Sequence, residues 1–130
     1  MVSQNLDDLL SLLMAVIVAD KRTFAEEIQV FVTEGVKLQT TLNMKPVMSE
    51  AKVLMWYELN KAAVKKNVLG PYLKTWLYDR LNRLAHIDNK PAILEAMRQV
   101  ALADGEIHVS ERALMVLAAR QWVLYPLGDA

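Results

Sequence analysis

The chain has 130 residues, equal numbers of basic and acidic side chains (15 each), and no cysteine. The charge balance argues against nucleic acid as a partner, because phosphate binding normally needs a clear excess or stripe of positive charge. The lack of cysteine excludes disulfide bonds and thiolate metal sites. With 54% hydrophobic residues the chain can bury a sizeable core, and its length indicates a single domain over residues 1–130.

The first predicted helix is apolar on nearly all sides. Apolar residues from Leu6 to Ala19 recur at helical spacing and also fill the other positions, which predicts a central, buried helix. A signal peptide is not expected, because Asp7 and Asp8 stand where such peptides carry positive charge. The apolar stretch is also too short to span a bilayer. We therefore expect no membrane insertion and a cytoplasmic location.

Two more helices are predicted in the first half of the chain. After a turn at 20–24, a second helix carries one apolar face, on which Gly35 favours close packing of a neighbouring helix. A break at 43–46 precedes a third helix, over about 47–66. The predicted apolar stripe of this third helix consists of Ala51, Leu54, Met55, Glu58, Leu59 and Ala62.

Trp56 and Tyr57 are neighbours on the third helix, and we expect only one of them to face inward. The other is expected to reach the surface, beside the lysines of that helix. An exposed apolar face of this kind favours binding to a second copy of the chain or to another protein. A solvated amphipathic helix with one partly exposed aromatic residue is the alternative.

Three helices are predicted in the second half of the chain. The fourth has a regular leucine and tryptophan stripe over 73–84, the fifth starts near Pro91 and ends at Asp104-Gly105, and the sixth covers about 109–123. No segment alternates at a period of two for long enough to indicate a strand. The predicted fold is all-α, a compact bundle of six to seven helices with short turns.

The turns before the second and the sixth helix have similar sequences. Ala19-Asp20 followed by Glu27 matches Ala103-Asp104 followed by Glu111, and each set lies between two apolar helical runs. Two related helical hairpins predict an approximate internal two-fold. Such symmetry would bring the acidic turns together and concentrate up to four carboxylates in one place.

Helix capping explains part of this pattern. Thr23 and Glu26 fit a capping box, and Glu111 falls three residues after His108, the predicted N-cap of the sixth helix. Capping explains Asp20 and Asp104 less well, because both follow a helix whose C-terminal dipole disfavours negative charge. Each aspartate needs compensation, either from the backbone N–H groups of its own turn or from a cation.

A divalent cation is the second explanation. Two carboxylates about 4 Å apart repel by about 4 kcal/mol at an effective dielectric constant near 20, so a cluster of four needs a cation or raised pKa values. Carboxylate oxygens suit Ca²⁺, Mg²⁺ or Mn²⁺. The candidate ligands are Asp20, Glu27, Asp104, Glu106 and Glu111, with Glu26 as an additional candidate.

The sequence ADGEIHVSERAL at 103–114 resembles the second signature motif of the TerB-like tellurite-resistance family, and residues 19–28 resemble a degenerate first motif. The resemblance covers most of the chain. It implies an all-helical fold with internal pseudo-symmetry and acidic residues in both motifs that bind metal. A related domain occurs beside the J-domain of a membrane-anchored cochaperone, so the resemblance also implies a cochaperone-like adaptor as an alternative function.

The first motif departs from the family pattern. Lys21 replaces the expected glycine, while Arg22 and Thr23 replace an acidic or polar residue and an aliphatic one. Either cation can neutralise Asp20 without a metal ion. The resemblance therefore supports Asp104 and Glu111 as ligands more strongly than the acidic residues of the first motif.

The sequence contains no recognisable catalytic motif. His86 and His108 lack the spacing of a zinc site and are expected to lie at helix ends. No glycine-rich phosphate loop or nucleophile elbow is present. We therefore expect a non-enzymatic protein that acts through contacts with another protein or with itself, and the resemblance implies a role in a stress response. A metal-independent interaction module is the alternative.

Overall fold

The computed structural model describes residues 3–19 and 25–123, and for Asp104 the backbone alone. All regular secondary structure in these residues is helical, which confirms the all-α fold class. The helices are α1 (Gln4–Val18), α2 (Ala25–Thr41), α3 (Glu50–Val68), α4 (Leu73–Arg83), α5 (Lys90–Ala101), the 3₁₀ turn η1 (Leu102–Asp104) and α6 (Val109–Gln121). In the described ranges, no helix has the length and apolar character needed to cross a membrane. The internal two-fold repeat stays a prediction.

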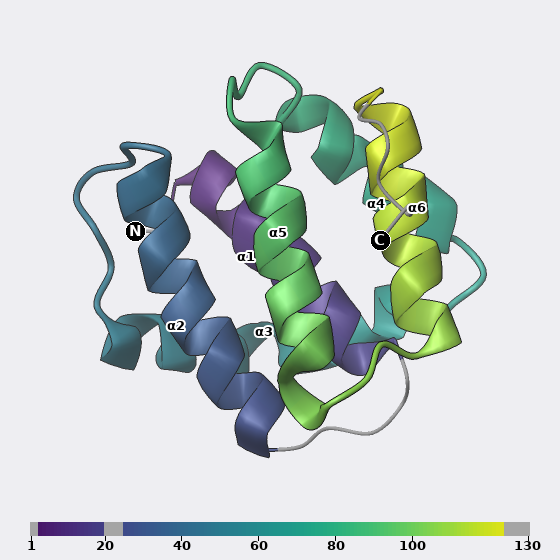
Figure 1. The fold of residues 1–130 in the computed structure, drawn as a ribbon, viewed down its shortest axis with the longest axis horizontal. Helices are drawn as coiled ribbons and strands as arrows, with labels where there is room; N and C mark the ends of the chain where they lie inside the picture. The colour runs from purple at the N-terminus through teal and green to yellow at the C-terminus, as the bar shows by residue number, and fades with distance from the viewer. Residues whose placement is uncertain (1–2, 20–24, 124–130) are drawn as a thin grey trace.

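Helix α1 lies at the centre of the bundle and packs against each of the other α-helices (Figure 1). Ser3 starts the helix, because its Oγ accepts a hydrogen bond from the N–H of Leu6 at 3.2 Å. From Leu9 to Val18 every side chain is buried, as the all-round apolar pattern predicts. Asp8 is the one charged side chain buried on this helix.

Helices α2 and α5 lie side by side and run in opposite directions across α1 (Figure 1). Gly35 lets α2 approach its neighbours closely. A Cβ atom at Gly35 would lie 3.1 Å from Leu10 Cδ2 on α1 and 3.3 Å from Val53 Cγ1 on α3, which is tighter than ordinary van der Waals contact. The predicted role of Gly35 in close helix packing is therefore confirmed.

Helix ends follow local capping chemistry. α3 begins at Glu50, three residues later than predicted, because Ser49 Oγ accepts the N–H of Lys52 at 3.3 Å. α5 begins at Lys90 with Pro91 in its first turn, and it continues through η1 to Gly105. Gly105 has a φ of 102°, the left-handed conformation that glycine adopts most readily at the end of a helix.

Helix α3 buries a different face from the predicted one. Trp56 and Tyr57 are both buried, with 5% and 3% of their surface exposed, so the expectation that only one faces inward is wrong. Adjacent helical residues are about 100° apart and can share a broad face when two neighbouring helices pack against it. Here α1 and α2 both pack on α3, and the Phe31 ring of α2 lies 6.2 Å from that of Trp56 and 5.5 Å from that of Tyr57.

Candidate functional site

The ends of the helices that border the two acidic turns lie at one edge of the molecule. The start of α2, the end of α5 and η1 meet at the lower edge of Figure 1, where η1 packs against α2. Asp20 lies outside the described residues, as do Lys21, Arg22 and Thr23, and nothing is described of the Asp104 side chain. The backbone of the second acidic turn is thus next to the helix that carries Glu26 and Glu27.

Glu27 on α2 and Glu111 on α6 are both fully buried, with 0% of their surface exposed. Burying a carboxylate is costly unless hydrogen bonds or opposite charge compensate it. Glu111 Oε1 accepts the backbone N–H of His108 at 2.8 Å, the reciprocal half of a capping box at the start of α6. The capping role predicted for Glu111 is therefore confirmed.

Glu26 and Glu106 are more exposed. Glu26 is exposed on the first turn of α2, and the Glu106 side chain is 75% exposed, with its Oε1 3.8 Å from His108 Nδ1. Among the side chains that the structure describes, no three histidine, aspartate or glutamate residues are grouped closely enough to hold a metal ion. Because two of the five predicted ligands fall outside that description, the cation site stays a prediction.

His108 is the N-cap of α6, as predicted, and His86 lies just after α4. His86 Nδ1 is 3.0 Å from the carbonyl oxygen of Arg83, and its Nε2 is 3.2 Å from Asn5 Nδ2. These contacts tie the end of α4 to the start of α1. They confirm the expectation that both histidines lie at helix ends.

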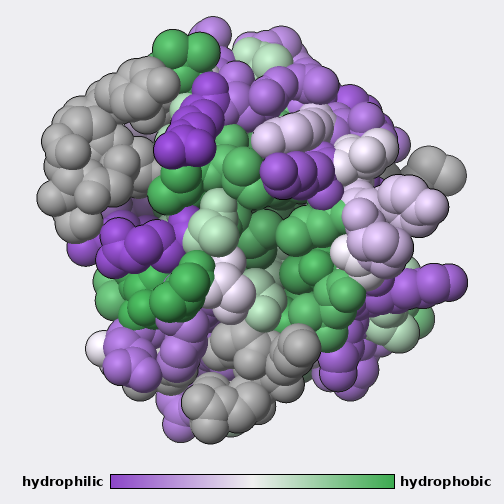
Figure 2. Space-filling model, turned by 90° about the vertical axis from the view of Figure 1, so that its right-hand side faces the viewer, coloured by the Kyte–Doolittle hydropathy of each residue, from purple (hydrophilic) through white to green (hydrophobic). Residues whose placement is uncertain are grey.

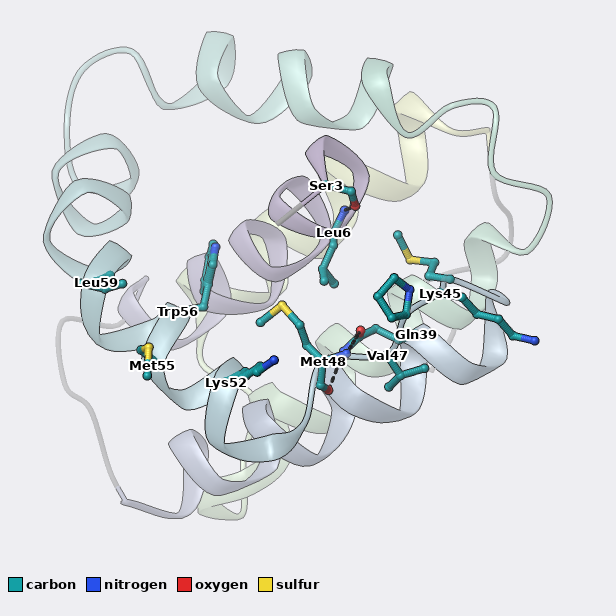
Figure 3. A pocket seen from close by; sticks show the side chains of 12 residues that line it. Ser3, Leu6, Gln39, Lys45, Val47, Met48, Lys52, Met55, Trp56 and Leu59 are labelled. Carbon is teal, nitrogen blue, oxygen red and sulfur yellow. Dashed lines mark hydrogen bonds between the residues drawn. The ribbon is translucent and has the colours of Figure 1, made fainter. Parts of the chain in front are cut away.

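A pocket of about 480 Å³ lies between the start of α1, the end of α2 and one side of α3 (Figure 3). This side of α3 carries the exposed residues Lys52, Met55 and Leu59 and is called the outer side of α3. Leu6, Met48 and Trp56 point toward one another across it, while Met55 and Leu59 continue along α3. The pocket is lined by Ser3, Leu6, Gln39, Met44, Lys45, Pro46, Val47, Met48, Lys52, Met55, Trp56 and Leu59. This volume lies within the range typical of small-molecule pockets.

Gln39 holds the wall of the pocket in place. Its Oε1 accepts the backbone N–H of Met48 at 2.6 Å, and its Nε2 lies 3.3 Å from the carbonyl oxygen of Met48 and 3.2 Å from that of Gly35 (Figure 3). This fully buried amide therefore fastens the α2–α3 connection to α2. The connection held in this way forms one side of the pocket.

The predicted apolar stripe of α3 faces solvent instead of the core. Met55 is 62% exposed and Leu59 is 77% exposed, and Leu54 is exposed as well. The buried face consists of Val53, Trp56, Tyr57, Val64 and Val68. The pocket was missed in the sequence because its lining comes from three segments. The sequence of α3 does carry one indication of this surface. Its apolar residues lie on two sides of the helix, and a helix at the surface buries only one side.

A second hydrophobic area lies on the side of the molecule formed by α4 and α6. Figure 2 shows hydrophobic side chains gathered there between polar ones. Val109 at the start of α6 and Val123 after its end are exposed. Of the two surfaces, the α3 pocket is the one whose volume and described lining residues are defined.

Comparison of the chain with protein-family models, with curated proteins and with solved structures finds no match. The resemblance to the TerB-like family therefore remains a prediction from the motif residues.

Proposed function

We propose that this chain is a non-enzymatic protein-interaction module that binds through the outer side of α3. The observation that carries the proposal is the exposure of Met55 and Leu59 beside a mainly apolar pocket. Contiguous apolar surface next to a hollow is typical of a binding site, whereas single exposed apolar residues are common on any protein.

The chemistry of the pocket favours binding over catalysis. The hydroxyl of Ser3 is engaged as the N-cap of α1, and the lining is otherwise apolar apart from Gln39 and two lysines. Among the described residues that line the pocket, there is no paired acid and base or nucleophile and base. A cochaperone-like adaptor is one form that such an interaction module takes.

Site-specific photo-crosslinking in the cells that produce the protein tests this function. A photoreactive amino acid at Met55 should give a discrete covalent adduct with another protein, because this side chain lies on the proposed interface. The same residue placed at Gln99, which is exposed on α5, is the matched control. If position 55 gives no adduct, or gives only the adducts seen at position 99, the proposed function is wrong.

A second function, divalent-cation binding at the acidic turns, is favoured by two observations. Glu27 and Glu111 are both fully buried, and η1 packs against α2, the helix that carries Glu27. The resemblance to the TerB-like family supports the same proposal and would place it in a tellurite-resistance stress response. The proposed ligands are Asp20, Glu27, Asp104, Glu106 and Glu111.

Calorimetric titration of chelator-treated protein with Ca²⁺, Mg²⁺ and Mn²⁺ tests cation binding. A bound cation should release or absorb heat and raise the melting temperature, because it binds the folded state alone. Glu111→Gln should remove both effects, whereas Glu95→Gln, an exposed change on α5, should keep them. An unchanged melting temperature and no heat with all three ions would contradict this function.

A further inference from the structure

We propose that the outer side of α3 binds an amphipathic helix of another protein, with carboxylates flanking the apolar side chains that enter the pocket. This inference rests on the proposed interaction function and names the chemistry of the partner. It is carried by the shape of the surface, by its charge and by the positions of its small side chains.

The shape of the surface fits a helix. The pocket lies at the N-terminal end of α3 and reaches Leu59, and Ala62 continues the apolar stripe about one turn beyond it. From Lys52 to Lys66 this side of α3 is about 21 Å long, at about 1.5 Å per residue. Ala62 and Ala63 are small and exposed, which allows a second helix axis to approach closely. A helix of about four turns with one large anchor at the pocket matches this length.

The charge of the surface selects an acidic partner. The chain as a whole has no net charge, but residues 43–68 contain five lysines and two glutamates. Lys45 and Lys52 line the pocket, and none of its described lining residues is acidic. Glu58 is already paired, with its Oε2 2.9 Å from Lys61 Nζ. The excess positive charge around the stripe therefore faces solvent without an equivalent number of carboxylates.

One carboxylate, that of Asp7 on α1, lies near this positive charge. It is the acidic residue in contact with Trp56, and its Oδ1 accepts the Trp56 Nε1–H at 3.0 Å. Asp7 is not part of the pocket lining. Carboxylates on an incoming helix would lie near Lys45, Lys52 and Lys66, where complementary charge speeds association and selects the partner.

A second copy of the chain fits this surface less well. A two-fold dimer pairs one surface patch with the same patch on the other molecule, so the lysines of α3 would meet lysines. Like charges facing one another disfavour such a contact. A membrane surface fits less well too, because a lipid headgroup layer does not fill a concave pocket whose opposing sides are formed by Leu6, Met48 and Trp56.

Methionine side chains make the pocket adaptable to a helix anchor. Met44, Met48 and Met55 line it, and the flexible thioether side chain moulds to apolar partners of different shape. The same residues supply a direct readout, since each methionine methyl group gives one NMR signal. Met14 and Met97, which are fully buried elsewhere in the core, provide internal controls.

The test uses the whole chain labelled with ¹³C at the methionine methyl groups and two synthetic peptides of about 14 residues. Both peptides carry leucine at positions i, i+3, i+7 and i+10, and their remaining positions are rich in glutamate in one and in lysine in the other. The acidic peptide should shift the signals of Met44, Met48 and Met55 and leave those of Met14 and Met97 in place. The basic peptide should bind at least about tenfold more weakly.

Three variants sharpen the test. Leu59→Glu should weaken binding of the acidic peptide by about tenfold or more, because it places a like charge in the apolar stripe. Lys52→Glu should weaken binding of the acidic peptide several-fold, and it should reduce the difference in affinity between the acidic and the basic peptide. Lys74→Glu, the same charge change at an exposed position of α4, should leave binding unchanged.

The proposal is overturned if the acidic peptide shifts none of the pocket methyl signals at about 1 mM, or if both peptides bind equally. Pocket shifts that depend on protein concentration without peptide would identify a second copy as the occupant. Shifts caused only by phosphatidylglycerol vesicles would identify a membrane. A crosslinked adduct at Met55 together with a failed peptide titration would leave the interaction function standing and reject this partner chemistry.

Discussion

Arg83 on α4 binds the buried carboxylate of Asp8 on α1 through two hydrogen bonds of 2.9 Å, from Nε to Oδ2 and from Nη2 to Oδ1. Gln4 Nε2 adds a third hydrogen bond, to Oδ1 at 3.1 Å. The bond to Asp8 raises the pKa of the Arg83 guanidinium above its ordinary value. This bidentate pair compensates the one charged side chain that the central helix buries.

Arg83→Met should lower the free energy of unfolding by about 2–3 kcal/mol, because it leaves Asp8 buried without its cation. The loss should be smaller than the 3–5 kcal/mol typical of a fully buried pair, since the Arg83 side chain is partly exposed to solvent. Arg98→Met is the matched control, because Arg98 makes an exposed contact with Glu95 at 3.6 Å and should contribute less than about 0.5 kcal/mol. Urea denaturation at pH 7 measures both variants.

The double variant Asp8→Leu/Arg83→Met should recover part of the lost stability, because it removes the buried charge together with its partner. A double variant less stable than the sum of its single changes would show that the pair does not act as a compensated unit.

The second prediction concerns the orientation of α3. Trp56→Ala should cost about 3–5 kcal/mol of unfolding free energy, because it removes a large buried ring and a hydrogen bond to Asp7. Leu59→Ala, one helical turn further on, should change it by less than about 0.5 kcal/mol. Thermal and urea unfolding measure the stability of both variants. A loss of unfolding free energy in Leu59→Ala comparable to that in Trp56→Ala would contradict the exposure of the α3 stripe.

The orientation of α3 could not be predicted from the sequence alone. The all-round apolar pattern of α1 predicted its central position, and Pro91 and Gly105 predicted the start and end of the α5 segment, because these signals are local. The buried face of α3 depends on which neighbours pack against it, and apolar residues lie on two of its sides. The pocket depends on contacts between Leu6, Met48 and Trp56 that no local pattern encodes.

In the acidic turns, too, the local features could be predicted from the sequence and the tertiary features could not. The capping contact of Glu111 with His108 follows from a spacing of three residues, so the sequence predicted it correctly. Full burial of Glu27 and Glu111 is a property of tertiary packing, and no local sequence pattern indicates it. The similarity of the two turns predicts that they lie close together. In the described residues, η1 of the second turn packs against α2, the helix that follows the first turn.

Gly35→Ala should destabilise the protein by about 1 kcal/mol, although alanine is the better helix former by a similar amount at an exposed position. The new Cβ would press on Leu10 and Val53, both almost fully buried, and so force a shift in the core. Thr33→Ala, on an exposed position of the same helix, should be neutral within about 0.5 kcal/mol.

Differential scanning calorimetry of the two α2 variants measures the effect. A gain of stability for Gly35→Ala would mean that α1 and α3 yield to the extra methyl group without cost, and that the close approach at Gly35 does not constrain the packing of the three helices.

The last prediction concerns the pH dependence of stability through Glu34 on α2. Burial raises the pKa of Glu34 above its ordinary value, Lys37 opposes the shift, and the carboxylate of Glu95 on α5 adds to it. A carboxyl group with a raised pKa holds its proton more readily in the folded state. Its favourable contribution is therefore fully present below the unfolded pKa of about 4.3 and is lost as the pH rises through the folded pKa.

Glu34→Gln should therefore stabilise the protein at pH 7 and have little effect near pH 4, where the unfolded glutamate also begins to bind its proton. The gain at pH 7 should stay below about 1 kcal/mol, because Glu34 is only partly buried and solvent screens its charge. Urea denaturation across this pH range measures the difference. Glu95→Gln should lower the pKa of Glu34, followed by carboxyl ¹³C NMR, because it removes a neighbouring negative charge. An equal effect of Glu34→Gln at both pH values would mean that the change acts through packing and not through the charge of this carboxylate.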